Sequence, residues 1–334
     1  MLTFLILASL LAAAALALVA LEVVRPPERV VNALFVVFSL LVVLLAAWTF
    51  ALLLGAGSEE GARFGNRVDA AIEILNRRPV DSGGRSVTVP KVPDFLAVYG
   101  SDLDRLGHEE GADSPNTGPL LAEMDRQLGR LVRATEDAGI REVTTFLLTS
   151  DHGMTTWSRP ATEGLAAIAR AGYRPEVVLP DRSPSADTEV VVVLNSVRVA
   201  DVTLLGRAAT PKGRERVRAA LEDTPHVAQV LDRSDLEELR ASDKLGDFVV
   251  EAEEPYGFAL EAPEGGASRG AHASTRETRV PLVLSRAGVR PGVTPRNPKL
   301  VDVAPTVAAL LGTRPPNEAQ GRALTEVLVD RRGR

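Results

Sequence analysis

Two short segments of the chain carry side chains suited to binding a divalent metal ion. Asp151 and His152 end an apolar run in the stretch TSDHGM, and Gly153 behind them permits a tight turn. Asp104 and His108 stand four residues apart in DLDRLGHEEG, so both side chains can lie on one side of a helical turn. Carboxylates and imidazoles are ligands that zinc accepts. The structural alternative is a helix cap and a packed ring in the first segment and a solvated acidic loop in the second.

The chain has only four histidines, so the surroundings of each one can be judged separately. His272 lies in the Gly-rich stretch GGASRGAHAST, ahead of the apolar run VPLVL, and a loop at that place suits a ligand better than a packed side chain. His226 follows Pro225 without an acidic partner that would mark a ligand pair, and we expect it to be structural. The chain contains no cysteine, which excludes disulfides and thiolate metal sites.

The composition is that of one sizeable globular domain with an added apolar segment. Of the 334 residues, 45% are hydrophobic and 25% are charged. The formal net charge is −6, so the chain lacks the general basic footprint of a protein that binds a nucleic-acid polymer. Nucleic acid is therefore not an expected partner.

The apolar excess is concentrated in residues 1–57, which we predict to form two transmembrane helices. Residues 2–24 and 31–54 each exceed the roughly 20 residues that span a bilayer. Arg25 and Arg29 lie in the connector, whereas acids follow the second segment, so the positive-inside rule places the connector in the cytoplasm. The first residues carry no cation, which disfavours a cleaved signal peptide. We therefore expect a two-pass protein of the cell membrane with an extracytoplasmic domain; two buried helices of a soluble protein are the alternative.

Beyond this segment, residues 58–91 are predicted to be a helix and a linker, and residues 92–334 alternate apolar runs with helical periodicity. Such alternation favours an α/β sandwich with a largely parallel sheet. Residues 160–262 are expected to form an inserted cap subdomain. Strands are predicted at 94–100, 142–150 and 279–289, and helices at 67–78, at 118–139 and after Pro305.

Several motifs, taken in order, point to a known family. The stretches DLDRLGHEEG, TSDHGM, GAHAST with RVPLVL, and VDVAPTVAALLG with QGRAL resemble the type I phosphodiesterase/nucleotide pyrophosphatase family of the alkaline phosphatase superfamily. The resemblance covers residues 66–326, and its SDHGM and Asp-x-x-Gly-His elements are specific. It implies an alkaline-phosphatase-like three-layer α/β sandwich with a small cap, and it implies hydrolysis of phosphate esters.

The resemblance also implies a centre of two zinc ions that bridge a phosphate while a Thr or Ser attacks it. Asp104, His108 and His272 match the ligands of one zinc ion, and Asp151 and His152 match two ligands of the other. Three nitrogen and oxygen ligands with an open position are typical of a catalytic zinc. Two metal ions about 4 Å apart can clamp the attacking and leaving oxygens of a phosphoryl group.

Two features of the family have no counterpart in this sequence: a first strand that ends in a zinc-binding Asp, and a Thr or Ser nucleophile at a helix N-terminus. Asp69 is the first Asp of the chain, and neither Asp69 nor Asp94 has a setting that marks a substitute ligand. Ser58 and Thr88 offer hydroxyls, but neither stands between a strand and a helix, where a neighbour would activate it. The chain therefore resembles the C-terminal part of the family's catalytic domain, incomplete at its N-terminal side, and no catalytic residue is assigned.

More than one function stays open on these observations. The first is a membrane-anchored, metal-dependent hydrolase of phosphate esters that uses zinc-activated water or residues from a partner chain. The second is an impaired relative that binds metal or a phosphorylated ligand without turnover, and a truncated gene product would show the same pattern. A purely structural membrane protein fits poorly, because it would not keep five metal-type residues in this register. The substrate, a phosphate-ester small molecule or a lipid headgroup, is not identified by the cap sequence.

Overall fold

The computed structural model describes residues 63–179 and 182–329, and helices and strands alternate throughout this part of the chain. The α-helices are α4 (Phe64–Leu75), α5 (Asp102–Glu110), α6 (Thr117–Asp137), α7 (Glu163–Arg170), α8 (Pro211–Glu222), α9 (Arg233–Glu238) and α10 (Val303–Leu311). The strands are β1 (Val80–Asp81), β2 (Ser86–Val87), β3 (Thr145–Thr149), β4 (Thr155–Trp157), β5 (Arg159–Pro160), β6 (Pro175–Val177), β7 (Val190–Val193), β8 (Val199–Leu204), β9 (Val227–Asp232), β10 (Phe248–Ala252), β11 (Tyr256–Gly257), β12 (Arg269–Ala271) and β13 (Leu282–Arg286).

Most of the elements predicted from hydrophobic periodicity are present. The predicted helices at 67–78 and 118–139 are confirmed as α4 and α6, and the predicted strands at 142–150 and 279–289 are confirmed as β3 and β13. The predicted membrane hairpin, residues 2–24 and 31–54, lies outside the described residues. Among the helices of the described part, each is too short or too polar to cross a bilayer.

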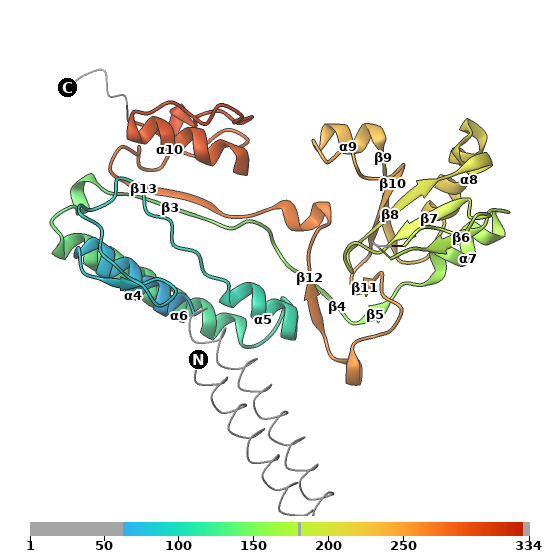
Figure 1. Cartoon of the computed structure of the whole chain (residues 1–334), viewed down its shortest axis with the longest axis horizontal. Coiled ribbons are helices and arrows are strands. Elements are labelled where there is room, and N and C mark those ends of the chain that lie inside the picture. Colours follow the sequence, from blue (N-terminus) through green and yellow to red (C-terminus); the bar gives the residue numbers. More distant parts are fainter. Residues whose placement is uncertain (1–62, 180–181, 330–334) are drawn as a thin grey trace, which may run out of the picture. The chain divides into compact units, whose positions relative to one another are not determined.

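The pair of strands β3 and β13 is enclosed by helices on two sides. Figure 1 shows α10 on one side of this pair and α4 with α6 on the other, which gives three layers of secondary structure. The strands run antiparallel with Leu148 opposite Val283. Their β-branched and aliphatic residues suit a pleated strand, although none of the residues of β3 or β13 is fully buried.

The prediction of a largely parallel sheet is wrong for the described strands. Only β6–β7 and β11–β5 are parallel among the pairs in this part of the chain, and β3–β13 is antiparallel. A parallel neighbour requires a crossover connection, usually a helix, that carries the chain back to the same end of the sheet. Here the chain leaves β3 through β4, passes through the cap and returns through β12, so β13 runs opposite to β3.

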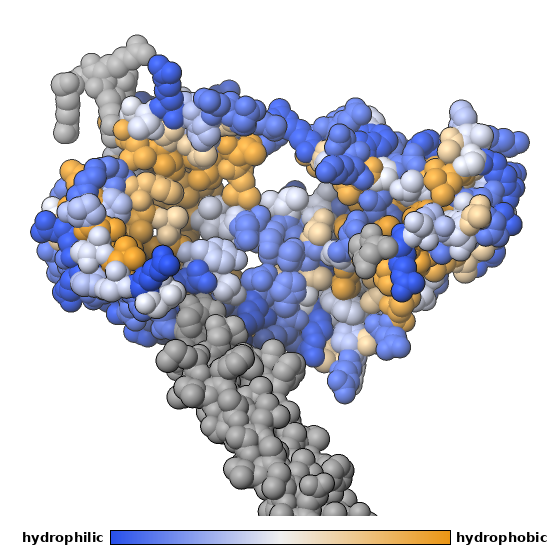
Figure 2. Space-filling model, viewed as in Figure 1, coloured by the Kyte–Doolittle hydropathy of each residue, from blue (hydrophilic) through white to orange (hydrophobic). Residues whose placement is uncertain are grey.

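The predicted strand at 94–100 is also absent, because these residues form neither helix nor strand. An apolar run becomes a strand only when its backbone pairs with a neighbour, and none of the described strands pairs with this segment. Phe95 and Tyr99 are exposed there. Apolar side chains are also half exposed on the two central strands, with 50% for Leu148 and 51% for Val283. Figure 2 shows hydrophobic residues gathered around the β3–β13 pair.

A second sheet forms most of the region between β5 and β12, where the cap was expected. Its five strands lie in the order β6-β7-β8-β10-β9, and all pairs except β6–β7 are antiparallel. Buried side chains alternate along β7 and β8, whereas every residue of β10 is buried. The apolar core of this subdomain contains Ile168 of α7, Val217 of α8 and Phe248 of β10, so the two helices pack on the sheet. Its residues are separate from those of the β3–β13 layers.

The helix α5 lies against β12 at a contact between two glycines. A Cβ atom added at Gly270 of β12 would lie 2.7 Å from the carbonyl carbon of Gly107 in α5 and 2.7 Å from Sδ of Met154. No side chain larger than a hydrogen fits between the helix and the strand at this point. The glycine at position 270 therefore sets how closely α5 approaches β12.

We expect the substitution Gly270→Ala to lower the free energy of unfolding by about 1–3 kcal/mol, because the added methyl group must push α5 and β12 apart. Urea denaturation of the purified protein followed by circular dichroism measures this change. The matched control is Gly129→Ala in the interior of α6, where an added Cβ would lie 3.7 Å from Arg133, an ordinary contact distance. That variant should gain up to about 1 kcal/mol from the higher helix propensity of alanine. Equal stability of the two variants would contradict the close-contact argument.

Candidate metal centre

Two of the predicted ligands are brought together by a pair of short strands. His152 lies between β3 and β4, and His272 follows β12 directly. Strands β4 and β12 run antiparallel, with Ala271 opposite Thr155. This register places the end of β12 beside the start of β4, so the two histidine side chains meet. Their rings are stacked, with centroids 3.6 Å apart and an interplanar angle of 15°.

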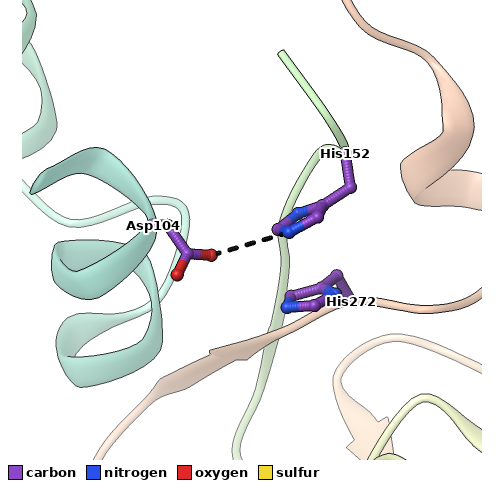
Figure 3. Close-up of side chains that lie close together, drawn as sticks. All are labelled: Asp104, His152 and His272. Carbon is purple, nitrogen blue, oxygen red and sulfur yellow. Dashed lines mark ion pairs between the residues drawn. The ribbon is translucent and has the colours of Figure 1, made fainter. Parts of the chain in front are cut away.

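The helix α5 contributes the other side of the cluster. Asp104 and His108 stand one helical turn apart, and Asp104 Oδ1 is 3.4 Å from His108 Nε2 and 3.9 Å from His152 Nε2. The His108 ring lies 5.1 Å from the His272 ring, measured between centroids. Figure 3 shows the Asp104 side chain pointing from α5 toward the stacked rings of His152 and His272. The predicted convergence of Asp104 and His108 on one side of a helical turn is confirmed.

Backbone carbonyl groups set the orientation of two imidazoles. His108 Nδ1 is 2.9 Å from the carbonyl oxygen of Gly270, and His152 Nδ1 is 2.9 Å from that of Gly153. A carbonyl oxygen can only accept a hydrogen bond, so Nδ1 carries the proton in both rings. In the neutral tautomer the free lone pair is then on Nε2, the atom that faces Asp104. This is the arrangement of a histidine ready to bind a metal ion.

The carboxylate of Asp104 is the strongest indication that a cation belongs here. Its Oδ1 atom is buried and has no hydrogen-bond partner. A buried acceptor without a partner costs about 1–3 kcal/mol, more when it is charged. Three potential ligand atoms, one from each of Asp104, His152 and His272, lie within 4.8 Å of one another. The residues present therefore fit a metal ion, which would satisfy the carboxylate and accept the imidazole lone pairs.

The protonation state of His272 also suits a ligand. Burial lowers the pKa of the His272 imidazole below its usual value, and the nearby rings of His152 and His108 lower it further. Burial disfavours the charged form of the His272 ring, and the neighbouring rings add to this effect. His272 is consequently neutral at pH 7, which is the form that binds metals.

Asp151 lies at the edge of the cluster. Its side chain is 61% exposed, and its Oδ2 atom is 3.7 Å from His152 Nε2. The structure thus gathers all five predicted ligands into one neighbourhood. The tight group contains Asp104, His152 and His272. The family resemblance assigns Asp104 and His272 to one ion and His152 to the other. The division into two zinc sites stays a prediction.

The acids considered as substitute ligands are engaged elsewhere. Asp69 on α4 forms an ion pair with Arg130 of α6 at 2.6 Å. Asp94 forms an exposed ion pair with Lys91 at 3.0 Å. Neither carboxylate belongs to the metal-binding cluster found among the described residues.

His226 has a structural environment, as its sequence context indicated. Its ring stacks on Tyr256 with centroids 3.4 Å apart and an interplanar angle of 9°. Its Nδ1 atom is 3.9 Å from a carboxylate oxygen of Glu253, a partner that the sequence did not indicate because it lies on a distant segment. His226 is therefore a suitable control residue for tests of the metal centre.

Sequence reasoning missed one residue next to the cluster, the buried Glu277. It lies in the 3-10 helix η4 (Thr275–Thr278), which follows His272, and it completes a capping box with Ser274. The spacing Ser-x-x-Glu in AHASTRET is the signature of such a box and offered a local signal. No local signal indicated its distant partners.

Comparison with known proteins agrees with this fold and these motifs. Residues 38–275 match the family described as type I phosphodiesterase/nucleotide pyrophosphatase. Ectonucleotide pyrophosphatase/phosphodiesterase family member 5 of Homo sapiens is 30% identical over 128 residues, which are 38% of this chain and 24% of the human protein. The solved structure of that human protein has a TM-score of 0.51 with 20% identity, over 81% of this chain and 65% of that chain.

A bacterial phosphatase is similar over a longer stretch. Alkaline phosphatase PafA of Elizabethkingia meningoseptica is 22% identical over 270 residues, 73% of this chain and 48% of PafA. A structure of a PafA mutant has a TM-score of 0.53 with 18% identity, over 84% of this chain and 56% of that chain. At these identities the solved structures show the fold alone, which is α/β and like that of alkaline phosphatase. The chain spans about a quarter of the human protein and about half of PafA in these sequence matches.

The match to the family description extends over most of the chain, and it includes the segments that carry Asp104, Asp151 and His272. The same three segments converge on one cluster in the structure. This chain belongs to the type I phosphodiesterase/nucleotide pyrophosphatase family.

Proposed function

We propose that this protein is a zinc-dependent hydrolase of small phosphate esters, with nucleotides and related phosphodiesters as the class to test first. The observation that carries the proposal is the buried Oδ1 atom of Asp104, which lacks a hydrogen-bond partner and faces the Nε2 atoms of His108 and His152. One carboxylate with several neutral imidazoles is a ligand set typical of a catalytic zinc. Membership of the family supports phosphate-ester hydrolysis as the reaction.

The proposed centre holds two zinc ions. Asp104, His108 and His272 would bind one ion, and Asp151 and His152 would bind the other, as the family resemblance implies. Zinc, when bound, supplies positive charge that stabilises phosphoryl oxygens, and it lowers the pKa of water to about 7. The greater exposure of Asp151 supports a second site that is more open than the first.

The chain's own residues orient two of the imidazoles and lower the pKa of a third. The carbonyl oxygens of Gly270 and Gly153 accept hydrogen bonds from His108 and His152, so both rings keep the tautomer that a metal ion requires. The lowered pKa of His272, caused first by burial, keeps that ring neutral near pH 7. The ligands are thus held in their binding form by the fold.

A second candidate function is binding of metal or a phosphorylated ligand without turnover, and the positions of the available hydroxyls favour it. Thr88 is exposed on the segment after β2, and Ser58 lies outside the described residues. Ser150 is adjacent to the cluster, but its hydroxyl donates a hydrogen bond to the carbonyl oxygen of His152 at 2.7 Å. Turnover would then rely on water or on a hydroxyl from a partner chain, whereas binding would need neither.

We also propose that residues 2–24 and 31–54 anchor the protein in the cell membrane, with the metal centre on the outer side. The length of these segments and the absence of charge from the second support the proposal. The full-length protein should stay with the membrane fraction after alkaline carbonate extraction, and protease added to intact spheroplasts should digest a tag at its C-terminus. Release of the protein by carbonate would contradict the anchor, and protection of the tag would contradict the orientation.

Purified full-length protein should hydrolyse a chromogenic phosphodiester when zinc is supplied, lose this activity to a chelator and regain it with added zinc. We expect His272→Ala and Asp151→Asn each to reduce the rate to background, because each removes a proposed ligand. The rate of 4-nitrophenolate release, together with zinc content from elemental analysis, provides the measurement.

The matched control is His226→Ala, which removes a histidine that stacks on Tyr256 away from the cluster and should keep both zinc and activity. A folded wild-type protein that binds zinc without hydrolysing any tested ester would favour the second candidate. Absence of zinc binding by the wild-type protein would refute the first candidate, and a protein that binds neither metal nor a phosphorylated ligand would refute the second as well.

A further inference from the structure

The loop that follows His272 is held by a buried carboxylate. Glu277 is 3% exposed, and it accepts hydrogen bonds from the backbone nitrogen of Ser274 at 2.7 Å and from the Ser274 hydroxyl at 2.6 Å. The hydroxyl of Thr155 on β4 donates a further hydrogen bond to it. Burial alone would raise the pKa of Glu277, but these hydrogen bonds and the nearby charge of Arg198 hold it below its usual value, so the group is ionised. One side chain thus joins the loop after His272 to the strand after His152.

The backbone of the same residue also touches the second histidine segment. The backbone nitrogen of Gly153 donates a hydrogen bond to the carbonyl oxygen of Glu277 at 2.7 Å. A Cβ atom added at Gly153 would lie 3.3 Å from that oxygen, so the two segments are in close contact. Glu277 therefore fixes the residue next to His152 through its backbone and the loop next to His272 through its side chain.

The cap completes this arrangement with an arginine. Arg198, directly before β8, is 2% exposed, and its Nε is 3.3 Å from a carboxylate oxygen of Glu277. The other guanidinium nitrogens donate to the carbonyl oxygens of Tyr256 at 3.0 Å and Ala252 at 2.7 Å, both of which belong to the cap region. Each of the three guanidinium nitrogens therefore has an acceptor, and these contacts fix Arg198 against the carboxylate of Glu277.

Two more cap side chains reach the same loop. The hydroxyl of Ser196 donates a hydrogen bond to the carbonyl oxygen of His272 itself at 2.6 Å. Glu251 of β10, which is buried, accepts hydrogen bonds from the backbone nitrogen of Thr275 at 2.7 Å and from its hydroxyl at 2.9 Å. The metal-binding loop thus rests on cap residues at three successive points.

The backbone of the loop requires such support. Ala273, next to His272, has a φ of 116°, a conformation that residues with a Cβ atom rarely adopt. A strained backbone of this kind persists only when its surroundings hold it in place. Loosening the contacts on either side of Ala273 should therefore allow His272 to move.

Stability alone is a weak explanation for a charged pair at this depth. The cost of removing both charges from water often cancels their attraction, and apolar residues can fill such a space equally well. An apolar pair could neither accept hydrogen bonds from Ser274 and Thr155, as Glu277 does, nor donate them to the cap carbonyl groups, as Arg198 does. The consequence specific to this pair is the geometry of the histidine segments.

We propose that Arg198 and Glu277 are positioning residues through which the cap sets the places of the two metal ligands His272 and His152. The inference rests on the proposed function in one respect, namely that these histidines bind zinc. It assigns to the cap a part in building the metal centre.

The variants Glu277→Gln and Arg198→Lys test this proposal, because each preserves much of the side-chain volume and changes the ion pair. We expect zinc to bind about 10- to 100-fold more weakly to either variant, in the range found for residues that orient metal ligands. Competition with a chromophoric chelator measures the affinity. The absorption bands of the cobalt(II)-substituted protein, which report ligand geometry, should also shift in position or intensity. The control is Arg214→Lys, which alters an ion pair with Asp247 inside the cap and should leave both readouts unchanged.

Folded Glu277→Gln protein with wild-type zinc affinity and wild-type cobalt bands would overturn the proposal while leaving the proposed function intact. If both variants fail to fold, Ser196→Ala decides. It removes the hydrogen bond from the Ser196 hydroxyl to the carbonyl oxygen of His272 and the one that the hydroxyl accepts from the backbone nitrogen of Arg198. A lowered zinc affinity supports the positioning role and an unchanged one overturns it. If the wild-type protein binds no zinc, the proposed function fails. In that case, amide hydrogen exchange of residues 273–278 tests the positioning role. Faster exchange in Glu277→Gln than in the wild-type protein would support this role, and unchanged exchange would overturn it.

Discussion

The close approach of α5 and β12 at Gly107 and Gly270 is the constraint on which the metal centre depends. An added Cβ at Gly270 would fall within 2.7 Å of the carbonyl carbon of Gly107, so only a hydrogen fits at this point. The carbonyl group of Gly270 also receives the hydrogen bond from His108, two positions before His272 in the chain. The same backbone contact therefore orients a ligand on the helix and places a ligand on the strand. A larger residue at position 270 would move the two sources of ligands apart.

This close packing creates an electrostatic problem that the protein alone does not solve. Asp104 presents a buried oxygen without a hydrogen-bond partner, and the two imidazoles nearest to that oxygen, those of His108 and His152, direct their Nδ1 protons to backbone carbonyl groups. Each feature is unfavourable in a partly dehydrated space, since neither the acceptor nor the lone pairs find donors among the described residues. A bound cation would satisfy all of them together. If the cation that we propose is bound, it would contribute to the stability of the fold as well as to the chemistry of the site.

Local signals in the sequence were sufficient for the parts of this centre that neighbouring residues determine. The spacing of Asp104 and His108 predicts that both lie on one side of a helical turn, and apolar runs predict the strand before Asp151 and the strand after His272. The direction of β13 was not predictable in this way, because it depends on how the chain returns from the cap. The prediction of a strand at 94–100 was wrong for a related reason. A strand forms only beside another strand, and the local pattern does not reveal whether such a neighbour is present.

The support of the ligands was still less visible, because it comes from residues far apart in the chain. Glu277 is linked to Arg198 and to Thr155, and only its capping box with Ser274 is local. Nothing in the stretch around Arg198 distinguishes it from a solvent-exposed arginine on the cap. Its role follows from burial and from the carbonyl groups around it, which only the folded chain brings together.

The chain topology explains why the cap and the metal centre are joined so firmly. Strands β4 and β12 hold His152 and His272 beside each other, yet residues 158–268 lie between them and form the cap region. Pairing β4 with β12 therefore requires this long segment to close on itself, which carries an entropic cost that a folded cap reduces. The parallel pair of β5 with β11 closes the base of the insertion directly next to β4. A folded cap therefore favours the strand pairing that holds the two histidines beside each other.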